Sequence, residues 1–248
     1  MEIENKVAVR DRKVIYREND KLIKLFDTTY SKSDILNEAL NQARVEETNL
    51  LIPKLQEVTK KDSKWAIVMD FVEGKTLEQL IEENPSKLSK YLDLFVETQM
   101  KIHSQKAPLL TKLADKMNRK IEETDLSSTI KFDLHSRVEG FSKHDKVLHG
   151  DYALSNVIVG KDGVYVVDWA HATQGNASAD VAMSYLIFML DGKEELGEKY
   201  IELYAKKSGT DVHYIKSWIS VVAASYLPKC ETKYKEKLLQ FVNVIDFQ

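Results

Sequence analysis

Two short stretches in the second half of the chain carry the polar side chains best suited to chemistry. A His-Gly-Asp triplet ends at Asp151 and is followed, after four residues, by Asn156, while Asp168 stands further along. Two carboxylates and a carboxamide offer oxygen ligands, and Mg²⁺ favours one or two carboxylates together with substrate phosphates. These residue types therefore indicate a magnesium-phosphate site.

A β-hairpin is the element that would bring these side chains together. Two β-branched runs, 157–159 and 164–167, flank the turn sequence Gly-Lys-Asp-Gly at 160–163. Antiparallel pairing about that turn puts Asn156 within a residue or two of Asp168. Asp151 lies in the loop that feeds the first strand. The alternative is structural, with Asp151 in an Asx-turn and Asn156 as a cap at the start of the strand.

The pattern resembles the aminoglycoside phosphotransferase and choline kinase family of the protein-kinase-like superfamily. There the loop reads His-Gly-Asp, four residues, then Asn, and an Asp-Trp pair replaces Asp-Phe-Gly. The resemblance implies that Asp151 accepts the proton of the substrate hydroxyl, and that Asn156 and Asp168 hold the metal. His149 would brace the loop through backbone contacts rather than carry a proton.

A lysine near the N-terminus completes the set that the resemblance implies. In the predicted strand 21–26, Lys24 shares a face with Leu22 and Phe26, and a lysine in apolar company usually has an anionic partner. The family's strand lysine grips the nucleotide phosphates. An edge-strand lysine that aids solubility is the alternative. Val9 to Asp20 contains no glycine, so phosphate binding would rely less on backbone amides.

The partner of that lysine is expected on a helix over about 33–47. Spacing favours Glu38, but helical phase does not, because Glu38 falls nearly opposite the apolar stripe formed by Ile35, Leu36, Ala39, Leu40 and Ala43. Glu46 lies closer to the stripe. We choose Glu38 on spacing; an exposed helix carboxylate is the alternative.

The segment after the predicted strand 65–69 resembles the family's hinge, where an adenine ring hydrogen-bonds to the backbone. Asp70, Phe71 and Val72 are the residues that this resemblance implies. An extended segment that ends at Gly74 would offer backbone groups to a ligand. A plain interdomain linker would have the same sequence character.

Strands are expected up to Phe26 and around 50–53 and 65–69, and helices fill most of the rest. The helical patterns cover about 76–83, 88–102, 109–121, 181–190, 194–207, 212–226 and 231–247, with 122–146 read as loop and a short helix. Asp180 matches the family's structural Asp, which bonds the catalytic-loop backbone, or it is a helix N-cap. Several aromatics could wall a substrate pocket, although core packing is the commoner role: Tyr185, Tyr204, Tyr214, Trp218 and Tyr226.

Bulk properties narrow the class of protein. The 248 residues suffice for a sizeable core, and the net charge of −3 argues against nucleic acid as a partner. The single cysteine excludes an intrachain disulfide. The charged start lacks the apolar core of a signal peptide, and the longest apolar stretch, 181–190, is too short to span a membrane. We expect a cytoplasmic protein with no membrane partner, a monomer or weak dimer.

The sequence thus predicts an α+β, protein-kinase-like bilobal fold with a small antiparallel-sheet N-lobe and a mostly helical C-lobe. Residues 1–72 would bind nucleotide, and 73–248 would carry the catalytic and substrate-binding parts. The expected function is transfer of the γ-phosphate of ATP or GTP, with Mg²⁺, to a small-molecule hydroxyl of an aminoglycoside, choline-like or sugar-like alcohol. A catalytically silent nucleotide-binding protein is the alternative. A protein kinase fits less well, because the Arg of His-Arg-Asp and the Ala-Pro-Glu motif are missing.

Overall fold

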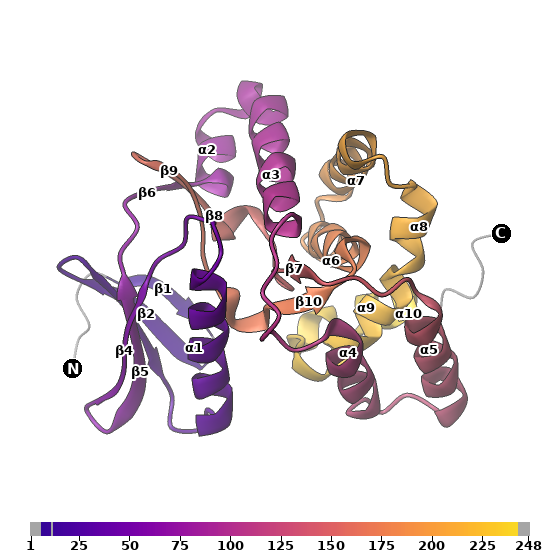
Figure 1. The fold of residues 1–248 in the computed structure, drawn as a ribbon, viewed down its shortest axis with the longest axis horizontal. Helices are drawn as coiled ribbons and strands as arrows, with labels where there is room; N and C mark the ends of the chain where they lie inside the picture. The colour runs from indigo at the N-terminus through magenta and orange to yellow at the C-terminus, as the bar shows by residue number, and fades with distance from the viewer. Residues whose placement is uncertain (1–5, 11, 243–248) are drawn as a thin grey trace. The chain divides into compact units, whose positions relative to one another are not determined.

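The computed structural model describes residues 6–10 and 12–242 (Figure 1). The chain divides into two units. The first takes in the chain up to Ser86 together with Leu154–Ala172, and the second takes in Lys87–Ala153 and the chain from Thr173 onward. This division differs from the lobes expected at 1–72 and 73–248. Residues 169–171, just after the hairpin, pack against the helix at 32–46, and the hairpin strand β8 (Val157–Gly160) pairs with β6 (Gly74–Thr76). The functional assignment of the two lobes remains a prediction.

An antiparallel sheet forms the core of the first unit. Its strands, in spatial order, are β1 (Lys6–Arg10), β2 (Lys13–Glu18), β3 (Lys21–Phe26), β5 (Lys64–Asp70) and β4 (Leu55–Lys61). The helix α1 (Lys32–Glu46) lies against β4 and β5 (Figure 1). The apolar side chains between helix and sheet include Phe26, Ile35, Ala39, Ile67 and Met69.

The prediction of a strand at 50–53 was wrong. That segment is irregular, and the partner of β5 is instead the edge strand β4. The polar, exposed Gln56 and Glu57 hide β4 from a search for alternating apolar residues. Pro53 cannot donate to a ladder, which explains why a strand begins only beyond it.

The predicted hairpin is confirmed. The strands β8 and β9 (Gly163–Val166) pair in the register Val157 with Val166 and Gly160 with Gly163, and β6 adds a third strand. The helix α2 (Leu77–Glu83) follows β6 directly, and Thr76 and Gln79 form a capping box at its start.

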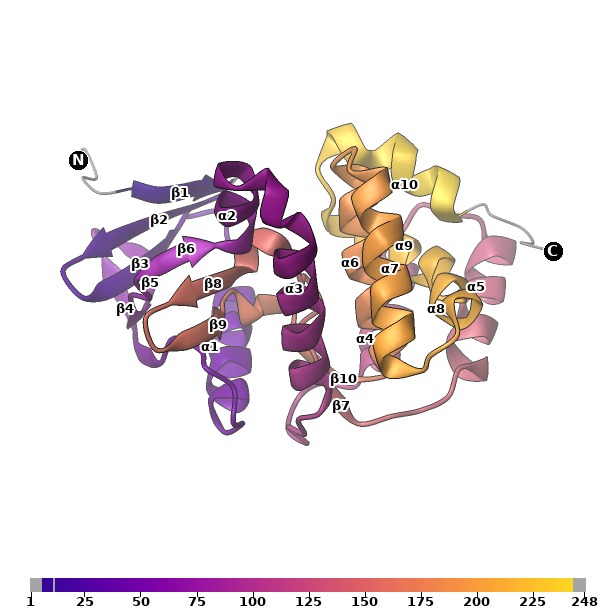
Figure 2. The ribbon, with the colours of Figure 1, turned by 90° about the horizontal axis from the view of Figure 1, so that it is seen from above.

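Helices make up most of the second unit: α3 (Leu88–His103), α4 (Leu113–Glu122), α5 (Ser128–Gly140), α6 (Ala177–Leu190), α7 (Glu194–Ser208), α8 (Val212–Ser217), α9 (Ile219–Tyr226) and α10 (Lys235–Val242). The short strands β7 (Lys146–Leu148) and β10 (Thr173–Gly175) pair antiparallel. Almost every residue of α6 is buried, and α7, α8 and α9 pack against it. Figure 2 shows α7 alongside α6.

Two expectations for this unit were wrong. The region 122–146 holds the full helix α5, which packs with α4 but buries few residues, chiefly Leu134 and Val138, and so has no clear apolar stripe. The helix expected at 212–226 is divided at Trp218 into α8 and α9. None of the helices within residues 6–10 and 12–242 has the length and apolar character that a bilayer span needs.

Candidate active site

A buried lysine links two carboxylates in the first unit. Lys24 on β3 donates a hydrogen bond of 2.6 Å to Glu38 Oε1 and one of 2.7 Å to Asp168 Oδ1. Its side chain is 4% exposed and that of Glu38 is 7% exposed. Burial alone would lower the pKa of Lys24, but the charges of Asp168 and Glu38 raise that pKa above its ordinary value. Because β3 lies between β2 and β5, Lys24 is no edge-strand lysine.

The structure places Glu38, and not Glu46, against Lys24. Glu46 instead accepts a hydrogen bond of 2.5 Å from the backbone N–H of Leu55. The predicted apolar stripe of α1 was partly wrong, because Leu36 and Leu40 are 42% and 47% exposed whereas Glu38 is buried. The face that α1 buries is therefore partly polar, and a search for apolar periodicity could not find it.

The hairpin brings Asn156 and Asp168 into neighbouring positions. Asn156 accepts a backbone hydrogen bond of 3.0 Å from Val167, the residue before Asp168. Asp168 has a left-handed backbone, with φ of 67°. Residues other than glycine rarely hold this conformation, and such strain tends to occur at functional sites. The turn thereby directs the Asp168 carboxylate to the sheet lysine.

The charge state of Asp168 suits a metal ligand. Burial would raise the pKa of Asp168, but the neighbouring Lys24 and Lys13 outweigh it and hold that pKa far below its ordinary value. The described residues contain no group of three or more His, Cys, Asp or Glu side chains able to hold a metal unaided. A carboxylate with a carboxamide fits Mg²⁺, which takes further ligands from water and phosphate. The donor chemistry of Asn156 and Asp168 therefore fits a shared magnesium-phosphate site.

Sequence reasoning missed a second lysine in this cluster. Lys13 Nζ lies 3.6 Å from Glu38 Oε2 and 3.8 Å from Asp168 Oδ1, and its side chain is 14% exposed. Its place in the basic run Arg10-Asp11-Arg12-Lys13 resembled an ordinary turn. Strand alternation was the available signal, because Lys13 stands two residues from Ile15, the partner of Lys24 across the ladder.

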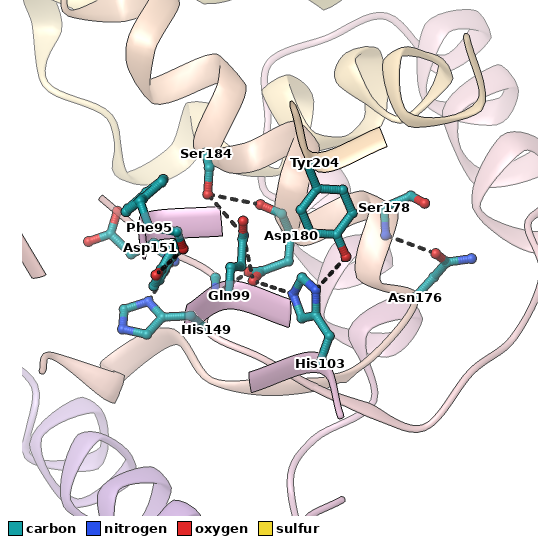
Figure 3. A network of polar contacts seen from close by, with 12 residues as sticks. Phe95, Gln99, His103, His149, Asp151, Asn176, Ser178, Asp180, Ser184 and Tyr204 are labelled. Carbon is teal, nitrogen blue, oxygen red and sulfur yellow. Dashed lines mark hydrogen bonds and ion pairs between the residues drawn. The ribbon is translucent and has the colours of Figure 1, made fainter. Parts of the chain in front are cut away.

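The loop that carries Asp151 is held by a buried polar network in the second unit (Figure 3). The backbone N–H of Gly150 donates a hydrogen bond of 2.6 Å to Asp180 Oδ1. His103 joins Asp180 to Tyr204, with contacts of 3.0 Å from Nε2 and 2.8 Å from Nδ1. Gln99 Nε2 also contacts Asp180, at 3.3 Å. The loop is therefore anchored through its backbone, one residue before Asp151.

Comparison with known proteins decides the family. Residues 10–214 match the model of the phosphotransferase enzyme family APH, a span that includes the candidate catalytic, nucleotide-binding and metal-binding residues. The chain belongs to this family. It is an enzyme of the kinase type, which transfers a phosphoryl group to a hydroxyl. A comparison with curated proteins finds no match.

Solved structures share the fold at low sequence identity. A thermostable mutant of aminoglycoside phosphotransferase APH(4)-Ia, in a ternary complex with AMP-PNP and hygromycin B, is 12% identical with a TM-score of 0.67, over 97% of this chain and 94% of that one. ADP-bound aminoglycoside phosphotransferase APH(2'')-Ib is 16% identical with a TM-score of 0.60, over 98% and 92%. A choline/ethanolamine kinase family protein from Mesorhizobium loti is 12% identical with a TM-score of 0.58, over 98% and 81%. The predicted protein-kinase-like α+β fold is confirmed.

Asp180 fulfils the expectation drawn from the family resemblance, since it accepts from the backbone of the His-Gly-Asp loop. The alternative of an N-cap was wrong: Asn176 caps α6, and its side chain accepts from Ser178 N. His103 is a buried histidine, and both of its ring nitrogens make polar contacts. His149 is fully buried, and its Nδ1 accepts from the backbone N–H of Asp151 at 3.3 Å, which fits a bracing role.

In the hinge expected from the family, Asp70–Val72, two backbone N–H groups already donate hydrogen bonds within the protein. The N–H of Phe71 donates to Asp20 O at 2.8 Å, and the N–H of Asp70 donates to Lys54 O at 3.0 Å. The guanidinium of Arg17 covers the Phe71 ring at 4.2 Å. The backbone N–H groups of Asp70 and Phe71 are therefore already hydrogen-bonded within the first unit.

Most of the candidate pocket aromatics are core residues. Tyr185, Tyr204 and Trp218 are buried, and Trp218 stacks on Phe141 with ring centroids 3.7 Å apart. Tyr214 is half-buried and accepts a hydrogen bond of 2.8 Å from Asn176.

Tyr226 remains a candidate for contact with substrate. Burial raises its pKa, and the charge of Asp151 raises that pKa further, so the two side chains lie within electrostatic reach. Lys116 on α4 is a basic neighbour of the same loop. Its pKa is lowered to about 7, mainly by burial and then by nearby cations, of which Lys229 is the strongest, while Asp151 acts in the opposite direction. The surroundings of Asp151 in the second unit are therefore partly cationic.

Proposed function

We propose that this enzyme transfers the γ-phosphoryl group of ATP or GTP to the hydroxyl of a small molecule in a Mg²⁺-dependent reaction. The observation that carries the proposal is the buried Lys24, hydrogen-bonded to both Glu38 and Asp168. Desolvation offsets most of the stability that a buried ion pair could contribute, so this one suggests a role beyond stability. The AMP-PNP and ADP in the structures of its relatives support a nucleotide as the donor.

Each residue has a distinct role in the proposed reaction. Asp151 orients the acceptor hydroxyl and accepts its proton. Asn156 and Asp168 would hold magnesium, which supplies charge neutralisation on the phosphates when bound. Lys24, fixed by Glu38, binds phosphate oxygens. Catalysis then rests mainly on alignment and on stabilisation of the charge that develops on the transferred group.

We also retain three finer assignments as proposals. Residues 1–72 bind the nucleotide, with adenine at Asp70–Val72, and residues 73–248 carry the acceptor site. The reaction takes place in the cytoplasm, where nucleoside triphosphates are present. The enzyme works as a monomer or weak dimer, without nucleic acid.

The test is nucleotide turnover by the native chain and by Asp151→Asn, with and without Mg²⁺, over a panel of alcohols. Loss of a general base costs about 10²- to 10⁴-fold in rate, and we expect a fall in kcat of that size with little change in nucleotide affinity. Aminoglycosides, choline-like amines and neutral sugars represent the acceptors of this family. Anionic alcohols belong in the panel as well, because Lys116 lies within electrostatic reach of both Asp151 and Lys229.

Two outcomes would contradict the proposal. Thermal stabilisation by nucleotide without turnover on any alcohol would favour a catalytically silent nucleotide-binding protein. Turnover that Asp151→Asn leaves unchanged would remove Asp151 from the reaction. Gly140→Ala is a suitable control, since a Cβ at Gly140 would meet no atom within 4 Å.

A further inference from the structure

Lys13 stands at the start of β2, directly after the connection from β1. Its position, two residues from the ladder partner of Lys24, puts both lysines on the same face of the sheet. The ammonium group lies within 4 Å of both carboxylates of the site, at 3.6 Å from Glu38 Oε2 and 3.8 Å from Asp168 Oδ1. A mostly buried side chain thus brings a second positive charge to the Lys24 cluster.

The geometry of the two lysines differs. Lys24 already bridges both carboxylates through hydrogen bonds of 2.6 and 2.7 Å. Lys13 stands beyond hydrogen-bond distance from the nearer oxygen of each carboxylate, Glu38 Oε2 and Asp168 Oδ1, so it neutralises charge without fixing either carboxylate. A single lysine would suffice to orient Glu38 and Asp168. The ion pairs of Lys24 therefore do not explain why a second cation, Lys13, is present.

Nucleotide binding would change the charge balance of this cluster. Two carboxylates face two ammonium groups, and a magnesium ion on Asp168 would add positive charge beside Lys13. The cations would then outnumber the anions in a partly buried place, which is unfavourable unless an anion enters. A polyphosphate chain supplies that anion.

The sequence of the β1–β2 connection points the same way. No glycine occurs between Val9 and Asp20, so this connection lacks the glycine-rich sequence whose backbone amides cradle phosphates in protein kinases. A side-chain cation at the start of β2 could replace those amides.

We propose that Lys13 is a second phosphate-binding lysine, which contacts the β- or γ-phosphate of the nucleotide in place of a glycine-rich loop. This inference rests on the proposed function. Lys24 and Lys13 then approach the phosphates from adjacent strands of one sheet. The alternative is a purely structural Lys13 that balances the charge of Glu38 and Asp168.

The test compares the affinities of ATP, ADP and AMP for the native chain, Lys13→Gln and Lys13→Arg, measured by titration calorimetry with and without Mg²⁺. Loss of one charge-assisted hydrogen bond typically weakens binding by about tenfold to a hundredfold. We expect Lys13→Gln to lose that factor for ATP, and for ADP as well if the contact is to the β-phosphate, but to bind AMP as the native chain does. Lys13→Arg should recover part of the affinity for ATP.

A control and two contrary outcomes complete the design. Lys60→Gln, on the exposed edge strand β4, removes the same charge away from the cluster and should leave all three affinities unchanged. Equal affinity of the native chain and Lys13→Gln for ATP, or an equal loss for ATP, ADP and AMP, would overturn the role of Lys13 but not the proposed function. A native chain that binds no nucleotide would overturn both.

Discussion

Lys24 is the residue whose surroundings explain most about the first unit. It is buried, charged and hydrogen-bonded to Glu38 and Asp168, residues that are 14 and 144 positions away in the sequence. Such a cluster is held together only by the tertiary structure. Removal of one partner from a buried ion pair leaves an uncompensated charge, which costs more than the pair contributes.

This arrangement predicts the stability of two variants. Lys24→Met should lower the free energy of unfolding by about 3–5 kcal/mol, because Glu38 would keep only the more distant Lys13. The double variant Lys24→Met, Glu38→Gln should be less destabilised than the sum of the single changes. Urea unfolding of Lys24→Met, Glu38→Gln and the double variant measures these losses. Additive losses would mean that the two side chains do not depend on each other.

Among the elements, β6 and β8 meet at an unusually close approach of two backbones. A Cβ at Gly74 would lie 2.4 Å from Val159 O and 2.8 Å from Ile158 Cγ2. Only glycine fits there without movement of one strand, so the sequence around 74 is constrained by the hairpin that carries Asn156. The close contact explains why the chain around residue 74 belongs with the hairpin in one unit.

Gly74→Ala should therefore separate β6 from β8 and cost about 1–3 kcal/mol of stability, the usual penalty for overpacking. Gly140→Ala is the matched control, because nothing lies near its added methyl group and alanine favours the helix α5 by up to about 1 kcal/mol. Thermal unfolding of both variants tests this. Similar melting temperatures for the two would contradict the close approach.

At the scale of the whole molecule, each unit contains an aspartate whose carboxylate neighbouring groups keep ionised. In the first unit this is Asp168. In the second it is Asp180, where burial would raise the pKa but His103 and the backbone N–H of Gly150 outweigh it and lower that pKa. Both carboxylates therefore bind a proton less readily when folded than when unfolded, where the pKa of Asp is about 3.9.

Stability should depend on pH accordingly. A depressed pKa contributes stability that is present above the unfolded pKa and is lost as the pH falls toward the folded one. The free energy of unfolding should thus decline below about pH 4, by about 1.4 kcal/mol per pH unit for each carboxylate. Chemical denaturation between pH 7 and 3 measures the slope.

Asp180→Asn should flatten that decline, since it removes one of the two carboxylates. Val138→Ala, a truncation of a buried residue in the same unit, should lower stability evenly at every pH. An unchanged slope in Asp180→Asn would show that Asp180 does not contribute to the acid sensitivity.

The sequence alone determined the family, the hairpin and the residues of its loop. These features are local: the triplet ending at Asp151, Asn156 and Asp168 all lie within one short stretch whose turn sets the strand register. The same is true of α2, where the Thr76–Gln79 capping box marks the start of the helix.

Only the tertiary structure decided between Glu38 and Glu46, and only it brought Lys13 to the site. Both results depend on which face of an element is buried, and the buried polar residues of α1 leave no apolar pattern that would reveal its buried face. Long-range electrostatics, such as the balance of Lys24 against two distant carboxylates, is a property of the packed chain. Periodicity reports neighbours along the sequence, whereas charges interact with neighbours in space.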